Sequence, residues 1–327
     1  MLLRLFKGSQ PVLIFIIPLV IGLVWLKSFL QPAVPLTGPD QWSMPVYDLI
    51  ARLLGNQAFL RKGIAMVLVI TNALWLSRMN TKFILVKSRT YLPAVFYSLI
   101  CSSVVAFHEL TPSLIASFLF IGALEIMFNS YGDEDLSYRF FEAALLVSLA
   151  SMTWSIMALY IIPLWIILSF LRNAGWREWL FILIGFALPY VFLYTIYYLT
   201  DQDIALNTQH ILSNFKLQKG MEFPDLLSII FYGYIALLIL IASLRLISIY
   251  QGMKIYVRKY FMVLFVIFVF TLGIHLVLYH NAMDLIFLYA IPVSYLFTFY
   301  FIQIRSNVLG EILFTVFLGL LALVIIF

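Results

Sequence analysis

The feature that most constrains this chain is a series of long apolar runs separated by short polar segments. Eleven runs can be recognised, and ten of them hold 17 to 22 residues. A helix needs about 20 residues to cross the hydrocarbon core of a bilayer, and a backbone without water must satisfy its own hydrogen bonds as a helix. The runs therefore predict an all-α, polytopic transmembrane bundle with about eleven spans, in which residues 1–327 form a single integral membrane domain. The predicted spans are residues 11–30, 62–78, 91–107, 111–128, 139–153, 155–171, 179–200, 226–247, 260–280, 283–303 and 308–327.

Composition excludes several other classes of protein. Hydrophobic residues make up 64% of the chain and charged residues only 11%, against about 45–50% and roughly 25% in soluble domains. A soluble enzyme, a disordered chain and a disulfide scaffold are therefore excluded. The single cysteine, Cys101, allows neither a disulfide within the chain nor a thiolate metal site. The net charge of +5 comes from basic residues in short loops, which indicates membrane topology rather than nucleic-acid binding.

The basic residues predict how the chain is oriented. With the N-terminus inside, fourteen of the twenty Lys and Arg residues fall on the inner side. Basic loop residues favour the cytoplasmic side of a membrane. We therefore expect a multi-pass protein of the inner (plasma) membrane, with a cytoplasmic N-terminus and a periplasmic C-terminus.

Two predicted outer loops, 31–61 and 201–225, are longer than a turn requires. Within the first, residues 45–60 carry apolar side chains at helical spacing on one face, and Asp48, Arg52 and Asn56 on the other. A spanning segment would place Asp48 and Arg52 in hydrocarbon, at about 2.5–3.5 kcal/mol each near the centre. We therefore expect this helix to lie flat in the outer interface.

Polar chemistry concentrates at the predicted outer face. No Asp, Glu, Lys or Arg lies near the centre of a predicted span, which counts against an ion-coupled transporter. His108 and Glu109 share one tight turn, and His280 and Asp284 are four residues apart across another. Their spacing matches no specific metal motif, so no cofactor and no metal ligand are predicted, although a His and carboxylate cluster could bind a divalent ion. Nucleotide-binding and hydrolase motifs are also absent from the sequence.

The segment Gly38-Pro39-Asp40-Gln41-Trp42 follows the first span and precedes the flat helix. A helix with an inside N-terminus, an outer loop with an acidic residue and an amphipathic interfacial helix resemble the opening of the GT-C superfamily of membrane glycosyltransferases. Residues 139–171 also resemble the paired short helices of such enzymes. Their first loop often reads Pro-Asp-Glu or Asp-Asp, whereas this chain has Gln41 in place of a second acid. The stretch FLRNAGWREWLFILIGFALPYVFLY gives the whole chain a closer resemblance to an uncharacterised family of polytopic inner-membrane proteins typical of Bacteroidetes.

The GT-C resemblance implies a function for the outer residues. Such an enzyme transfers a sugar from a polyprenyl-phosphate donor to a protein, lipid or glycan acceptor, and one carboxylate deprotonates the acceptor. Asp40 is the first candidate for that base and Asp48 is the second. Cationic donors would hold the lipid phosphate. The candidates for that contact are Arg52, Arg61, Lys62, Lys216 and Lys219.

A structural interpretation of the same residues stays open. Asp40 could be a turn residue after Pro39 or a helix N-cap, and Asp48 could belong to the solvated face of the flat helix. The chain would then be a non-catalytic membrane subunit that scaffolds an envelope complex. Besides the surrounding membrane lipids, the expected partners are a lipid-linked sugar and its acceptor in the first case, and other membrane proteins in the second. Neither interpretation involves nucleic acid.

Overall fold

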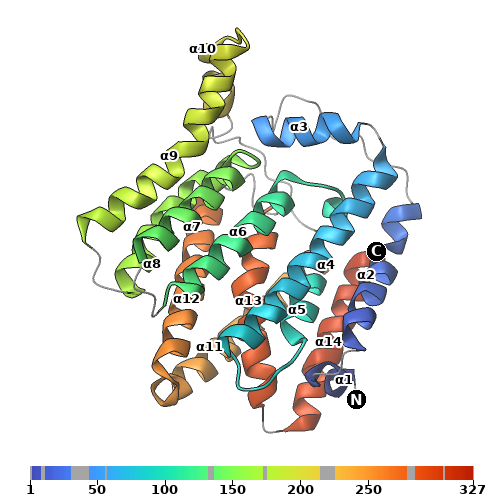
Figure 1. Ribbon diagram of the computed structural model, residues 1–327. Coiled ribbons are helices and arrows are strands. Elements are labelled where there is room, and N and C mark those ends of the chain that lie inside the picture. Colours follow the sequence, from blue (N-terminus) through green and yellow to red (C-terminus); the bar gives the residue numbers. More distant parts are fainter. Residues whose placement is uncertain are drawn as a thin grey trace. The chain divides into compact units, whose positions relative to one another are not determined.

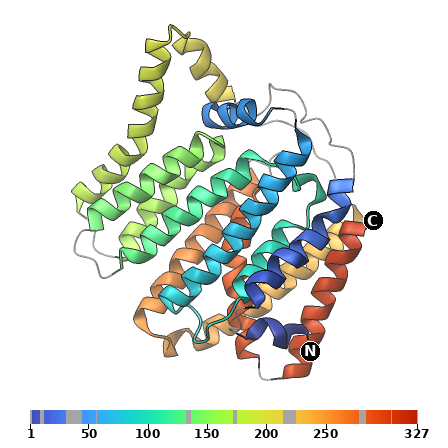
Figure 2. The same cartoon turned by 45° about the vertical axis from the view of Figure 1, so that its right-hand side comes forward.

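The structure of the chain is a computed structural model that describes residues 2–8, 12–30, 44–55, 57–131, 136–171, 175–213, 225–277, 284–304 and 306–326. Every regular element in these ranges is a helix (Figures 1 and 2), so the predicted all-α class is confirmed. The first elements are α1 (Leu2–Lys7), α2 (Leu13–Leu30), α3 (Pro45–Leu54), α4 (Ala58–Phe83), α5 (Leu92–Cys101), η1 (Val105–Phe107), α6 (Pro112–Asn129) and α7 (Leu136–Ser151). The later elements are η2 (Ser155–Tyr160), α8 (Ile161–Leu171), α9 (Trp176–Leu199), α10 (Ile204–Ser213), α11 (Leu226–Ile249), η3 (Tyr250–Gly252), α12 (Ile255–Val277), α13 (Ile286–Gln303) and α14 (Asn307–Ile326).

Eight helices in the described part of the chain are long and apolar enough to cross a membrane, which makes the protein multi-pass. They are α2, α4, α6, α9, α11, α12, α13 and α14. The other three predicted spans form shorter elements, namely α5 with 10 residues, α7 with 16 residues and the joined η2 and α8 over 155–171. A 16-residue helix is about 24 Å long at 1.5 Å per residue, less than the roughly 30 Å of a hydrocarbon core. The expected count of about eleven spans is therefore not confirmed.

The chain divides into two compact units. Unit 1 holds residues 1–32, 62–109 and 220–327, and unit 2 holds residues 33–61 and 110–219. Each unit thus draws on stretches that are far apart in the sequence.

Helix α13 forms the core of unit 1. It packs against α5, α11 and α12, and 72% of its 18 residues are buried. The ring of Phe96 on α5 lies 5.5 Å from that of Phe297 and 5.2 Å from that of Phe301. Phe314 and Phe317 of α14 contact the same ring. The edge-to-face contacts among these rings add to the energy of their burial.

Hydrogen bonds also cross between helices in the interior of unit 1. The Asn72 side-chain amide on α4 donates to the Tyr97 hydroxyl of α5 at 3.1 Å. The Tyr295 hydroxyl on α13 donates to the Leu76 carbonyl oxygen at 2.8 Å. Polar side chains in an apolar bundle are usually satisfied across helices in this way.

Unit 2 is organised around α7, which packs against both α6 and α9 (Figures 1 and 2). The α7–α9 contact is close because small residues line it. A Cβ atom on Gly185 of α9 would lie 2.6 Å from the Phe141 carbonyl oxygen and 3.2 Å from the Ala144 Cβ. The Ser148 hydroxyl donates to the Phe186 carbonyl oxygen at 2.6 Å. Small residues with a hydroxyl bond across the seam are a common way for membrane helices to associate.

The amphipathic helix predicted over 45–60 ends earlier than expected. Helix α3 stops at Leu54, and the chain resumes as α4 at Ala58, which runs on to Phe83. Gly55 adopts a φ of +59°, which a residue without a Cβ reaches at little cost. This glycine separates the amphipathic helix from the spanning one.

Candidate functional site

A buried polar cluster lies where α2 of unit 1 meets the loop between α5 and α6. The imidazole of His108 stacks on the indole of Trp25, with ring centroids 4.3 Å apart. Its Nδ1 lies 2.6 Å from the Ser28 hydroxyl, and its Nε2 lies 3.0 Å from the Ser102 carbonyl oxygen. Trp25 and Ser28 are three residues apart and so share one face of α2. The indole N–H of Trp25 donates to the Ser102 hydroxyl at 2.9 Å, which completes a closed network.

The partners of His108 determine its protonation state. A carbonyl oxygen can only accept a hydrogen bond, so Nε2 of His108 carries a hydrogen and donates it to the Ser102 carbonyl oxygen. In the neutral ring Nδ1 then has no hydrogen, and it accepts a hydrogen bond from the Ser28 hydroxyl. The pKa of His108 is lowered to about 4, mainly by burial and in smaller part by the positive charge of Lys62, while the hydrogen bond to Ser102 opposes the shift. The ring is therefore neutral at pH 7.

Lys62 reaches the same region from the first turns of α4. Its side chain is 6% exposed, and Nζ donates to the Ser28 carbonyl oxygen at 2.5 Å. This carbonyl lies in the last turn of α2, where main-chain oxygens have no partner within the helix. A cation at that position also complements the negative end of the helix dipole.

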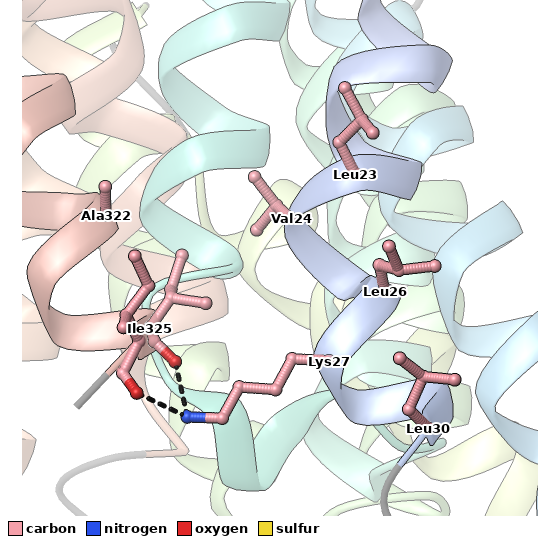
Figure 3. A pocket seen from close by; sticks show the side chains of 8 residues that line it. Leu23, Val24, Leu26, Lys27, Leu30, Ala322 and Ile325 are labelled. Atoms are coloured by element: carbon pink, nitrogen blue, oxygen red, sulfur yellow. Dashed lines mark hydrogen bonds between the residues drawn. The ribbon is translucent and has the colours of Figure 1, made fainter.

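Lys27 likewise donates hydrogen bonds to main-chain carbonyl oxygens, here at the end of α14. Its Nζ donates to the carbonyl oxygens of Ile325 at 2.9 Å and Ile326 at 2.8 Å (Figure 3). The side chain crosses a groove of about 540 Å³ between α2 and α14. Among the described residues that line the groove, Lys27 is the one charged group and the others are apolar. The lining residues are Leu23, Val24, Leu26, Lys27, Leu30, Ala322, Ile325 and Ile326.

The second candidate base, Asp48, lies in unit 2 on α3. Hydrogen bonds help to hold this helix: the Tyr47 hydroxyl donates to the Leu110 carbonyl oxygen at 3.0 Å, and the Val46 N–H donates to the Met152 carbonyl oxygen at 3.1 Å. Asp48 is half-buried and lies within electrostatic range of the Tyr197 hydroxyl of α9.

The other side of α3 is open. Leu49 is 59% exposed and Leu53 is 77% exposed, and Arg52 is exposed beside them. Apolar side chains exposed on a short amphipathic helix suit a membrane interface. Arg61, at the start of α4, donates through Nε and Nη2 to the Gly55 carbonyl oxygen, which links the two helices across the break.

Two further predicted residues of unit 1 are Glu109, in the loop between α5 and α6, and Asp284, just before α13. The ring of Phe107 is 6.0 Å from that of Phe287, so the loop that carries His108 and Glu109 contacts the first turn of α13. Asp284 occupies the turn just before this helix, and burial raises the pKa of its carboxyl to about 7.

The structure brings together part of the predicted outer set. His108 and Lys62 both bind Ser28 in unit 1, whereas Asp48, Arg52 and Arg61 belong to unit 2. Among the described residues, no group of three or more His, Cys, Asp or Glu side chains is arranged to hold a metal ion. The remaining predicted residues fall outside the described part of the chain. They are Asp40, Lys216, Lys219 and His280.

Comparisons with known proteins give no guide to the site. No family model, no curated protein and no solved structure matches the chain.

Trp25, Ser28 and Ser102 were not among the residues predicted from the sequence. One signal could have found the first two, because Ser28 is a polar residue in an apolar run and lies one helical turn after a tryptophan. Ser102 binds His108 through its main chain, which leaves no trace in the sequence.

The Ser28–His108–Ser102 series has the order of a nucleophile, a base and an orienting acceptor. Ser28 is 4% exposed and His108 is 1% exposed, so no substrate reaches the hydroxyl. The arrangement is therefore suited to a structural role, in which its hydrogen bonds hold α2, α4 and the α5–α6 loop together.

Proposed function

We propose that the chain is a GT-C-like glycosyltransferase, which transfers a sugar from a polyprenyl-phosphate donor to a protein, lipid or glycan acceptor. The observation that carries this proposal is α3. This short helix comes directly after the first loop, keeps the Asp48 carboxylate half-buried, and exposes Leu49 and Leu53. An enzyme with a lipid-borne donor needs a carboxylate to act as the base and an apolar surface to contact the lipid, both at the same depth of the membrane.

In this proposal the reaction occurs at the periplasmic face of the inner membrane. The N-terminus is cytoplasmic and the C-terminus periplasmic, following the distribution of basic residues. The short elements α5, α7 and η2–α8 complete about eleven crossings, and the α7–α8 pair takes the place of the paired short helices of GT-C enzymes.

The chemistry assigned to the chain is general base catalysis. Asp40, or Asp48 in second place, accepts the proton of the acceptor hydroxyl as its oxygen forms the bond to the sugar and the lipid phosphate leaves with the bonding electrons. Arg52 is exposed beside Leu53, where a guanidinium can contact a phosphate at the membrane surface.

The test is transfer of labelled sugar from polyprenyl-phosphate donors by the purified full-length chain. Asp40→Asn should lower the rate by about 10²–10⁴-fold, the usual contribution of a general base, and Asp48→Asn should lower it less. Asp201→Asn is the matched control, because Asp201 is exposed in the second long outer loop with a φ of +51°, which asparagine tolerates. Full activity of both Asp40→Asn and Asp48→Asn would exclude the assigned bases.

A scaffold subunit is the second candidate, and a separate observation favours it. Arg61 and Lys62, two of the five cations assigned to the donor phosphate, donate instead to main-chain carbonyls, at Gly55 and at Ser28. If the parent protein neither turns over nor binds any polyprenyl-phosphate donor, the scaffold interpretation replaces the enzyme.

A further inference from the structure

A second, more polar pocket lies in unit 1 where α11 and α13 end side by side. It measures about 260 Å³ and is lined by Arg245, Tyr300, Gln303 and Ile304. The first three side chains carry a guanidinium, a phenol and a carboxamide, all of which donate hydrogen bonds. Among the described residues, no carboxylate lines the pocket. Its lining is therefore suited to an anion.

Arg245 has its charge available at this pocket. The side chain is half-buried in the last turns of α11 and lies within electrostatic range of the Tyr300 hydroxyl. In the described ranges, Arg245 forms no ion pair with a carboxylate. A guanidinium forms strong, charge-assisted hydrogen bonds with an anion.

The surroundings of the pocket match the headgroup region of a membrane. Leu240, Leu244 and Ile247 of α11 are exposed apolar residues next to Arg245, at 66%, 69% and 69% exposure. Lys254, which follows η3, is exposed and does not line the pocket. Basic pockets between membrane helices bind the headgroups of anionic lipids.

We propose that the Arg245 pocket binds a phosphate ester, supplied by the headgroup of an anionic lipid whose chains lie along the exposed face of α11. Arg245 contacts two phosphate oxygens with its planar fork, a geometry that matches phosphate better than lysine does. The hydroxyl of Tyr300 and the amide of Gln303 donate to the remaining oxygens. This binding site is independent of sugar transfer, because its residues are distinct from those assigned to catalysis.

The experiment is titration of the detergent-purified full chain with lipids, followed by native mass spectrometry. Phosphatidylglycerol should bind at least about tenfold more tightly than diacylglycerol, which lacks the phosphate, since hydrogen bonds to charged groups are each worth that factor or more. Arg245→Gln should weaken the binding of phosphatidylglycerol by about tenfold or more. Tyr300→Phe, which removes one hydroxyl, should weaken it by a smaller factor and serves as the test if Arg245→Gln does not fold.

Lys254→Gln is the matched control, because it removes a positive charge at the same end of α11 without touching the pocket. It should bind phosphatidylglycerol as the parent does. Equal binding by Arg245→Gln and the parent, or an equal loss in Lys254→Gln, would overturn the site. Glycerol 3-phosphate separates the two sources of phosphate: if it binds as tightly as phosphatidylglycerol and depends equally on Arg245, the pocket takes a soluble phosphate ester, and the lipid assignment is wrong.

Discussion

The imidazole of His108 lies flat against the indole of Trp25, with the ring centroids 4.3 Å apart and the planes inclined by only 12°. The contact joins residues 83 positions apart in the sequence, one on α2 and one in the loop after α5. Ser28 and Ser102 fix the rotation of the ring through its two nitrogens. Stacking and hydrogen bonding therefore act on the same side chain, which makes it a sensitive point in unit 1.

Replacing His108 should destabilise the protein. His108→Ala removes the stacked ring and leaves the Ser28 hydroxyl and the Ser102 carbonyl without their buried partner, at a cost of about 2–4 kcal/mol. The free energy of unfolding can be measured by SDS titration of the detergent-purified chain. His275→Ala is the control: within the described residues this half-buried ring has no hydrogen-bond partner at Nδ1, so its loss should cost clearly less. Equal costs would show that the network around His108 does not stabilise unit 1.

The pH dependence of stability should reflect two opposed groups. Burial lowers the pKa of His108 from 6.5 to about 4, so the unfolded chain binds more protons between these values and stability rises with pH. Burial raises the pKa of Asp284 from 3.8 to about 7, so the folded chain binds more protons and stability falls with pH across nearly the same range. The two contributions largely cancel in the parent.

Single substitutions should separate these contributions. In Asp284→Asn, where His108 is unopposed, stability should rise as the pH goes from about 4 to 6.5, by on the order of 3 kcal/mol for a shift of this size in His108. His108→Gln should lose stability over the range from about pH 4 to 7, because Asp284 is then unopposed. SDS unfolding at a series of pH values measures both. Parallel profiles for the two variants would contradict the assignment.

The close contact of α7 and α9 should not tolerate a side chain at Gly185. A Cβ there would lie 2.6 Å from the Phe141 carbonyl oxygen, so Gly185→Ala forces the helices apart and should cost about 1–3 kcal/mol. A Cβ on Gly233 of α11 would have no described atom within 4 Å, so Gly233→Ala should be neutral or stabilising by up to about 1 kcal/mol. Thermal unfolding of both variants beside the parent tests the difference, and a loss in Gly233→Ala as large as in Gly185→Ala would refute it.

The amphipathic helix α3 should lie on the outer side of the membrane. In a Cys101→Ser background, Arg52→Cys should react with a membrane-impermeant maleimide added to intact cells, because position 52 is exposed before the start of α4. Lys82→Cys, near the other end of α4, should react only after the cells are opened. Labelling at position 82 and protection at position 52 in intact cells would reverse the orientation.

Hydropathy was enough to predict where helices form, because transfer of a segment into lipid depends on the sum of its side chains. It was less successful with lengths: residues 91–107 form a 10-residue α5 followed by a break and η1, since a run of apolar residues does not reveal where a helix ends. The helix α10 within the predicted outer loop 201–225 was also missed, because a short helix among polar residues carries little apolar signal.

The candidate site was predictable only in part. His108 and Lys62 stood out as ionisable residues at the predicted outer face, and the structure places them in one network. Their partners, however, are a serine in an apolar helix and two main-chain carbonyls. Such contacts depend on which helices become neighbours, and the pattern of apolar runs in a single sequence does not reveal which helices pack together.

Unit 1 is closed by contacts between opposite ends of the chain. The Leu3 N–H donates to the Glu311 carboxylate at 3.2 Å, and Lys27 binds the Ile325 carbonyl oxygen 298 positions away. A ribosome releases the N-terminal helices first, so α2 enters the bilayer long before its partner on α14 exists. Residues 110–219, most of unit 2, are made in the interval. During biogenesis the Lys27 ammonium therefore has only water or lipid headgroups as partners until α14 emerges and supplies its terminal carbonyl oxygens.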